Sequence, residues 1–266
     1  MPTRTEPWPH GTPCWVDLAV PDVAAAAEFY GGLLGWTAVD SGEEMGHYHI
    51  CSVGDRAAAG IGPIMEEGQP SAWTVYLASD DADATVKAIG EAGGNVLVPP
   101  MEIPGNGRMV IAQDPAGAVF GVWESQGMVG IGIYNEPGGL LWEDARLSDP
   151  DAGRAFYASV FGHRYEPVEG APAGYTIFHT GGHPLGGLGG LDGLPDGVPS
   201  HWLPYFAVAD ADAAIATATA AGGQVVAGPQ DSPWGRMACL TDPQGAVFMV
   251  MSAAAGDGSQ EDTAAG

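Results

Sequence analysis

The sequence predicts an α+β protein built from four βαβββ modules, and two observations lead to this prediction. The first is an internal duplication, because Trp15-Val16-Asp17 returns as Trp142-Glu143-Asp144 at an offset of 127 positions. The second is that strand-like alternation and helix-like periodicity follow one another in the same order twice within each half. A period this long indicates a duplicated domain rather than the short unit of a solenoid.

Further matches appear at this offset or within one or two positions of it. They pair Phe29-Tyr30 with Phe156-Tyr157, Gly35 with Gly162, Tyr48 with Tyr175, Gly107-Arg108-Met109 with Gly235-Arg236-Met237, and Asp114-Pro115 with Asp242-Pro243. The small drift of the offset indicates single-residue insertions within an otherwise complete copy.

The first module has local signals for each of its elements. Residues 14–20 alternate as a short strand does, and Asp22 stands at the N-cap of a helix predicted over 23–34. Apolar residues on one face support that helix, and Gly35 ends it. Two strands should follow, at 48–53 and 57–61.

The order restarts in the second module. We predict a strand at 73–78, a helix at 82–92 capped by Asp81, and strands at 95–98, 108–113 and 118–124, with Asp114-Pro115-Ala116-Gly117 as the last turn. The third and fourth modules should open at Leu141 and His201, with helices at 151–161 and 211–221.

The charge balance restricts the partners of this chain. It has 33 acidic against 8 basic side chains, for a net charge of −25. Such a polyanion gains nothing from counterion release, so we expect neither nucleic acid nor an anionic membrane as a partner. The acidity suits either a solvated surface or the attraction of cationic small molecules.

Compartment and domain limits follow from simple features. Three widely spaced cysteines without a CxxC motif, and no signal peptide or membrane-length apolar run, indicate a cytoplasmic protein. We expect a monomer or homodimer. The expected layout is a flexible arm at 1–11, domains at 12–127 and 139–252 joined by a linker at 128–138, and a disordered tail at 253–266.

Three motifs resemble the vicinal oxygen chelate superfamily, which includes glyoxalase I, bleomycin-resistance proteins and extradiol dioxygenases. They are Leu-Ala-Val-x-Asp at 18–22, Phe-Tyr-x-x-x-Leu-Gly-Trp at 29–36, and Asp-Pro-x-Gly-x-x-Phe-x-x-x-Glu at 114–124. The chain looks most like the actinobacterial two-domain glyoxalase-like group. The resemblance implies two cup-shaped, mainly antiparallel sheets with helices outside. It leaves open whether neighbouring modules pair, or the first pairs with the fourth.

The resemblance also implies a divalent metal held by residues of the first and last strands of the modules. The corresponding positions of this chain are poor ligands, since they hold Trp15, Thr74 and Glu124 in one half and Trp142, Leu203 and Ser252 in the other. A lone Glu124 cannot retain a catalytic metal. We therefore expect no metal and no cofactor. The alternative is an atypical site in which Asp17 or His49 joins Glu124.

Two other polar groups have simpler interpretations. His47 and His49 are two positions apart on an expected strand, and we interpret them as solvated histidines because the second half has no counterpart. Asp114 and Asp242 are expected to bind the backbone of their turns.

Strand alternation predicts which side chains line the cups. Asp17 and Asp144 share a face with Trp15 and Trp142, where each carboxylate either contacts a ligand, acts as a base or pairs with Arg108 or Arg236. The full set of predicted ligand-binding residues is Trp15, Asp17, Tyr48, Tyr76, Arg108, Phe120 and Glu124 in the first half, and Trp142, Asp144, Tyr175, Tyr205, Arg236 and Phe248 in the second. Val122 and Val250 are expected on the same faces.

These residues favour a binding protein over an enzyme. Aromatic rings and carboxylates suit a flat, cationic secondary metabolite that the protein sequesters or delivers in antibiotic resistance or biosynthesis. One alternative is a glyoxalase- or dioxygenase-like enzyme with unusual metal ligands. The other is a cofactor-free enzyme that uses Asp17 or Asp144 as its base.

Overall fold

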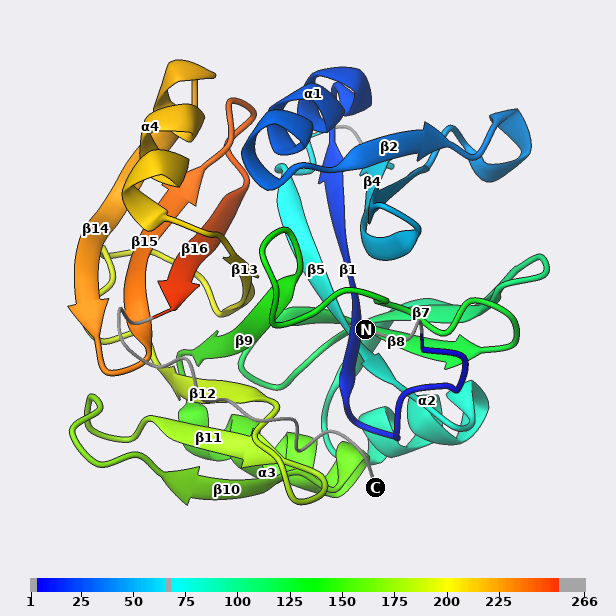
Figure 1. Ribbon diagram of the computed structural model, residues 1–266. Helices are drawn as coiled ribbons and strands as arrows, with labels where there is room; N and C mark the ends of the chain where they lie inside the picture. Colours follow the sequence, from blue (N-terminus) through cyan, green and yellow to red (C-terminus); the bar gives the residue numbers. More distant parts are fainter. Residues whose placement is uncertain (1–3, 66–67, 254–266) are drawn as a thin grey trace.

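The computed structural model describes residues 4–65 and 68–253, and these form two eight-stranded sheets with four α-helices (Figure 1). The tail expected at 253–266 lies outside the described residues except for Ala253. No helix within the described part is long and apolar enough to cross a membrane.

Each half of the chain forms one sheet. The first sheet has the order β2-β3-β4-β1-β5-β8-β7-β6. Its elements are β1 (Pro13–Val20), α1 (Val23–Leu34), β2 (Thr37–Asp40), β3 (His49–Val53), β4 (Arg56–Pro63), β5 (Ala72–Ala78), α2 (Ala82–Glu91), β6 (Asn95–Ile103), β7 (Gly107–Gln113) and β8 (Val119–Ser125).

The second sheet repeats this order as β10-β11-β12-β9-β13-β16-β15-β14. Its elements are β9 (Leu140–Leu147), α3 (Pro150–Phe161), β10 (Arg164–Pro167), β11 (Thr176–His179), β12 (Gly186–Gly190), β13 (His201–Ala207), α4 (Ala211–Ala220), β14 (Gln224–Ser232), β15 (Gly235–Thr241) and β16 (Val247–Ala253). The predicted α+β fold of four βαβββ modules is therefore confirmed.

The local start and stop signals work as the sequence predicts. The Asp22 carboxylate accepts a hydrogen bond from the Ala25 amide at 2.9 Å, and Gly35 ends α1 with a left-handed φ of 72°. Asp81, Asp149 and Asp210 cap the other three helices in the same way. These bonds satisfy amides that a helix end leaves without an intrahelical partner.

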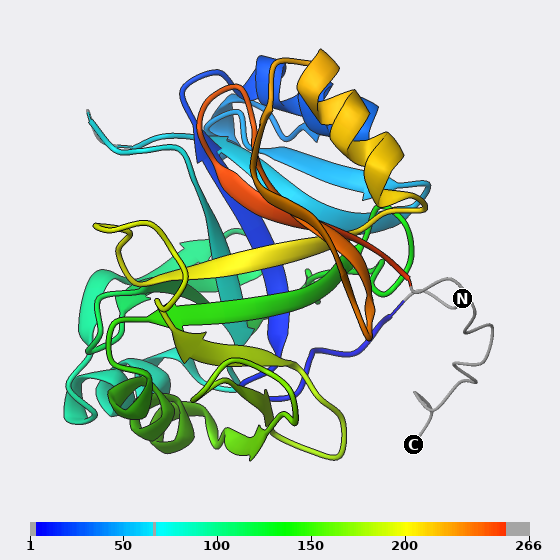
Figure 2. The ribbon, with the colours of Figure 1, turned by 90° about the vertical axis from the view of Figure 1, so that its left-hand side faces the viewer.

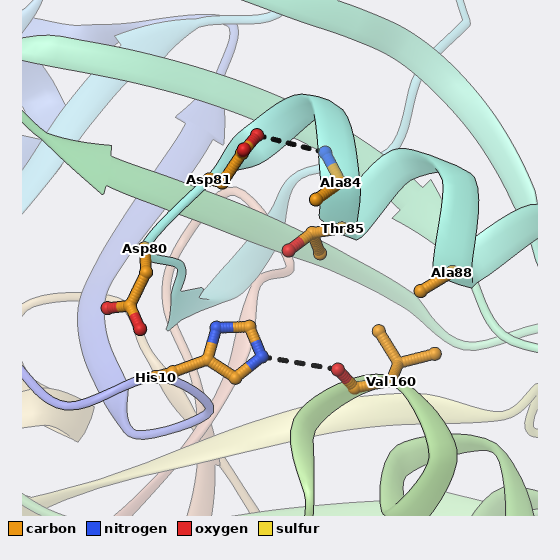
Figure 3. A pocket seen from close by; sticks show the side chains of 7 residues that line it. All are labelled: His10, Asp80, Asp81, Ala84, Thr85, Ala88 and Val160. Atoms are coloured by element: carbon orange, nitrogen blue, oxygen red, sulfur yellow. Dashed lines mark hydrogen bonds between the residues drawn. The ribbon is translucent and has the colours of Figure 1, made fainter.

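The sequence left open which modules pair, and in the structure the strands and the helices pair differently. Within each sheet, neighbouring modules pair along their first strands, where Trp15 lies opposite Tyr76 and Trp142 opposite Tyr205. The helices instead pack across the halves, α1 against α4 and α2 against α3. Figure 2 shows α1 and α4 side by side at one end of the molecule.

The two halves are joined by the same buried polar contact used twice. The Tyr30 hydroxyl donates to Asp242 at 3.2 Å and accepts from the Trp73 indole at 3.1 Å. The copy joins Tyr157 to Asp114 at 2.9 Å and Trp202 to Tyr157 at 2.8 Å. Both aspartates also accept backbone amides of their turns, as predicted. Their second role, at the junction of the halves, was not foreseen.

Each sheet therefore has two different faces. The helix face packs against helices and the other half, and an aromatic core fills this junction. The opposite face is here called the cup face. In β5, alternation puts Trp73, which bonds to Tyr30 of α1, on the helix face and Tyr76 on the cup face.

The cup-lining prediction was wrong for the last strand of each half. Phe120 packs edge-on against Phe156 and Tyr157 of α3, and Phe248 contacts Phe29 and Tyr30 of α1. Both rings are fully buried. Val122 and Val250 share their strand face and are fully buried too. These four side chains belong to the junction core and not to the cups.

Candidate functional site

The centre of the first cup face is the Asp17 carboxylate on β1. One of its oxygens, Oδ2, accepts the Tyr76 hydroxyl at 2.9 Å and the Tyr48 hydroxyl at 3.3 Å. The Trp15 indole donates to the Tyr48 hydroxyl at 2.9 Å. Burial raises the pKa of Asp17 to about 6, although the tyrosine hydrogen bonds oppose this rise.

The second cup face repeats this cluster around Asp144 on β9. Tyr205 donates to Oδ2 at 2.8 Å, and Tyr175 donates to Oδ1 at 2.8 Å. The Trp142 indole donates to Asp144 Oδ1 at 3.0 Å and lies 3.3 Å from the Tyr175 hydroxyl. The structure thus brings together Trp15, Asp17, Tyr48 and Tyr76 in one half and Trp142, Asp144, Tyr175 and Tyr205 in the other, as clusters we call the Asp17 cluster and the Asp144 cluster.

Glycines on the neighbouring strands make these clusters possible. Gly121 of β8 lies beside Tyr76, and a Cβ atom at this position would come within 2.1 Å of its ring. Gly187 of β12 lies beneath Tyr175, where a Cβ would come within 2.0 Å of the hydroxyl. The aromatic rings therefore lie directly on the backbone of the sheet.

The predicted arginine partners of the central aspartates are elsewhere. Arg108 forms ion pairs with Asp83, Glu102 and Glu124, and Arg236 forms ion pairs with Asp212 and Asp231. Neither arginine contacts Asp17 or Asp144 among the interactions of the described residues. Of the alternatives left open for the central carboxylates, pairing with these arginines is therefore the one that is wrong.

Glu124 is also away from the cup centre. Its Oε2 accepts the Ala82 amide at the start of α2 at 2.8 Å and lies 3.3 Å from Arg108. It shares a strand face with the buried Phe120 and Val122, opposite to Gly121. The prediction that Glu124 lies on the cup face with Asp17 was therefore wrong. Successive side chains of a strand point to opposite faces, and Glu124 is on the helix face.

The two histidines do not lie on one strand as expected. β3 begins at His49, and His47 precedes it with a left-handed φ of 58°. His47 lies 2.9 Å from Asp40, and the ring of His49 bonds to the His47 carbonyl at 2.8 Å. They stabilise a turn and do not converge on Asp17.

Sequence reasoning missed two basic residues on the second cup face. Arg146 follows Asp144 by two positions on β9, and His201 is its cross-strand partner on β13. Both are half-buried. Alternation from Asp144 was the available signal, since it places Arg146 on the same face.

Comparison with known proteins agrees with this architecture. Residues 13–122 and 139–250 each match the family model described as Glyoxalase/Bleomycin resistance protein/Dioxygenase superfamily. The chain belongs to this family. The two matched segments correspond to the two sheets, so each half of the chain is one glyoxalase-family unit.

Two similar relatives come from actinobacteria. CFP32 of Mycobacterium tuberculosis, a glyoxylase by name, is 41% identical over 261 residues, which cover 96% of this chain and 99% of CFP32. The anthracycline biosynthesis protein DnrV of Streptomyces peucetius is 40% identical over 258 residues, covering 91% of this chain and 93% of DnrV.

Solved structures support the fold alone. A Mn(II)-bound glyoxalase from Novosphingobium aromaticivorans superposes with a TM-score of 0.64 at 18% identity, covering 92% of this chain and 83% of that chain. The 2,3-dioxygenase LapB from Pseudomonas sp. KL28 gives a TM-score of 0.64 at 14% identity, covering 92% and 93%.

The metal used by many glyoxalase-family enzymes does not fit the donors of this chain. Within the described residues, no three His, Cys, Asp or Glu side chains come together to hold a metal ion. Trp15 and Trp142 stand where first-strand ligands are expected, and an indole N–H only donates. Asp17 accepts tyrosine hydroxyls, and Asp144 accepts tyrosine hydroxyls and an indole N–H, so neither is surrounded by further ligands.

Proposed function

We propose that the protein binds an aromatic secondary metabolite on its cup faces without a metal, and that it serves to sequester or deliver this compound. The observation that supports the proposal is the repeated cluster of one carboxylate, two tyrosines and one tryptophan. Flat rings with hydroxyl and indole groups offer both stacking surface and hydrogen bonds to a partly polar ligand.

Charge favours an amine on this ligand. Asp17 and Asp144 are carboxylates with no ion pair among the described residues, in a chain of net charge −25. Trp15 is almost fully buried and Trp142 is half-buried, so an ammonium group over Trp142 would gain about 0.5–2 kcal/mol from cation–π attraction. The relationship to DnrV, named for anthracycline biosynthesis, points to aromatic polyketides bearing an amine.

A titration of the full chain with an anthracycline tests this proposal. We expect saturable quenching of tryptophan fluorescence, and recovery of the ligand unchanged by mass spectrometry. Trp15→Phe and Trp142→Phe should each weaken binding or quenching, whereas Trp234→Phe, at an exposed position, is the matched control. Unaltered binding by the double Trp15→Phe, Trp142→Phe variant would contradict it.

A cofactor-free enzyme is the second candidate, because the pKa of Asp17 is raised to about 6. A carboxylate that titrates near neutral pH is suited to moving a proton in either direction. The same mass spectrometry decides between the two: a ligand converted by wild-type protein but not by Asp17→Asn would replace binding with catalysis.

A further inference from the structure

Arg146 and His201 distinguish the second cup from the first. They are directly opposite each other on β9 and β13, two positions beyond the pair Asp144 and Leu203. The corresponding cross-strand pair in the first cup, two positions beyond Asp17 and Thr74, is Ala19 and Ala72. Since the register is the same in both halves, the basic pair is specific to one cup.

Arg146 lacks the partner that most basic side chains of this chain have. Five of the eight form ion pairs with carboxylates, namely Arg56, Lys87, Arg108, Arg154 and Arg236. Arg146 forms none within the part of the chain that the structure describes. Its Nε donates to the Gly190 carbonyl at 2.9 Å, which orients the guanidinium while its terminal amines have no hydrogen bond to described residues.

His201 is oriented by a backbone contact. Its Nδ1 lies 2.8 Å from the Pro199 carbonyl, and a carbonyl only accepts, so Nδ1 carries the proton. In the neutral ring, Nε2 is then a hydrogen-bond acceptor. Burial lowers the pKa of His201, which favours this neutral form. No described residue donates to Nε2.

We propose that the second cup binds the acidic hydroxyl of an aromatic ligand, either a phenol or a carboxylic acid, between Arg146 and His201. A phenol hydroxyl donates to His201 Nε2 while the guanidinium donates to the same oxygen, whereas a carboxylic acid group, already ionised, accepts from the guanidinium. Trp142, Tyr175 and Tyr205 on the same face provide the surface for the ring. This inference rests on the proposed function, and it assigns acidic groups to the second cup alone.

Calorimetric titration of the full-length protein with four matched naphthalenes tests the inference. The probes are 2-naphthoate, 2-naphthol, the neutral 2-naphthylmethanol and 2-naphthylmethylammonium. We expect the two acidic probes to bind more tightly than the neutral alcohol. Arg146→Gln should weaken 2-naphthoate binding about tenfold, because a charge-assisted hydrogen bond is lost. The alcohol should change by less than about twofold, since uncharged contacts are unaffected.

Two further variants complete the test. His201→Gln should weaken 2-naphthol binding. Arg164→Gln should change nothing, because this exposed arginine bonds only to the Thr180 carbonyl among the described residues. Thermal unfolding of each variant checks that the fold is intact. An effect on both acids supports a general acidic-hydroxyl site, and an effect confined to 2-naphthoate identifies the ligand group as a carboxylate.

Failure of the inference is distinguishable from failure of the proposed function. If the neutral and ammonium probes bind but 2-naphthoate binding is the same in wild type and Arg146→Gln, the acidic-hydroxyl site is disproved and aromatic binding stands. If none of the four probes nor an anthracycline binds, the proposed function fails and the inference fails with it.

Discussion

The two cups have the same centre and different surroundings. In both, a carboxylate is held by two tyrosine hydroxyls and accompanied by an indole. Around this centre Ala19 and Ala72 are replaced by Arg146 and His201. On the other face of the strand, Val16 is replaced by Glu143. The duplicated centre suggests a shared mode of ring binding, and the divergent surroundings suggest different ligand groups.

The largest expected effect tests the separation of the cup face from the helix face. Phe120→Ala and Phe248→Ala should each lower the free energy of unfolding by about 3–5 kcal/mol, because each leaves a cavity in the junction core. Ligand affinity of the protein that remains folded should be unchanged. Denaturant unfolding and fluorescence titration measure the two quantities, with Val119→Ala at an exposed position as the control. A stable Phe120→Ala variant with weakened ligand binding would return Phe120 to the cup.

The pH dependence of stability sharpens the description of the first cup. Because burial raises the pKa of Asp17 from 3.8 to about 6, the folded protein binds the proton more tightly than the unfolded chain does. The stability contributed by this proton is fully present below pH 4 and is lost as the pH rises from about 4 to 6, by about 3 kcal/mol at most. Above pH 6 the loss is complete.

Asp17→Asn should remove the pH-dependent part of the stability that comes from protonation of Asp17. Its side-chain oxygen can still accept both tyrosine hydroxyls, so the variant should gain stability relative to wild type between pH 4 and pH 7. Urea unfolding at both pH values measures the difference, and Asp192→Asn at an exposed position controls for the loss of one charge. An equal gain in both variants would show that net charge, rather than the Asp17 environment, is responsible.

The hydrogen bonds of the Asp17 and Asp144 clusters predict a smaller difference, in the stability lost when one tyrosine hydroxyl is removed. The Tyr175 hydroxyl donates to its carboxylate at 2.8 Å, whereas that of Tyr48 donates at 3.3 Å. Tyr48→Phe should nevertheless destabilise the protein more, by about 1–3 kcal/mol, because it also leaves the buried Trp15 indole without an acceptor, whereas the Trp142 indole keeps its bond to Asp144. Thermal unfolding of the two variants at pH 7 gives the comparison, and a larger loss for Tyr175→Phe would reverse the ranking.

The smallest expected effect concerns Glu143, the counterpart of Val16. It is buried, no described residue bonds to its carboxyl group, and burial raises its pKa well above the usual value. Because the pKa of Glu143 is higher in the folded protein than in the unfolded chain, proton binding at Glu143 stabilises the fold at low pH. This stabilisation is lost as the pH rises above the ordinary pKa range of glutamate. Glu143→Gln should stabilise the protein at pH 8 by about 1 kcal/mol, the low end for an unpaired buried polar group. The gain should shrink at pH 4, and an equal gain at both pH values would contradict this.

The sequence by itself determined the duplication, the order of the elements and most of their ends. Asp22 and Gly35 delimit α1 through contacts only three or four residues long, and such contacts are readable from a single chain. Alternation also placed Asp17 beside Trp15 and Tyr76. These features depend on local geometry, so no knowledge of distant segments is needed.

Only the tertiary structure decided which side chains of β8 lie on the cup face. β8 contains a run of buried residues on both faces, so its pattern does not show which face meets the helices. Because side chains alternate along a strand, one wrong choice of face misplaced both Phe120 and Glu124 in the cup. Likewise, Tyr48 and Tyr76 reach Asp17 from 31 and 59 positions away. Gly121 can be interpreted only once the Tyr76 ring is seen to lie on it.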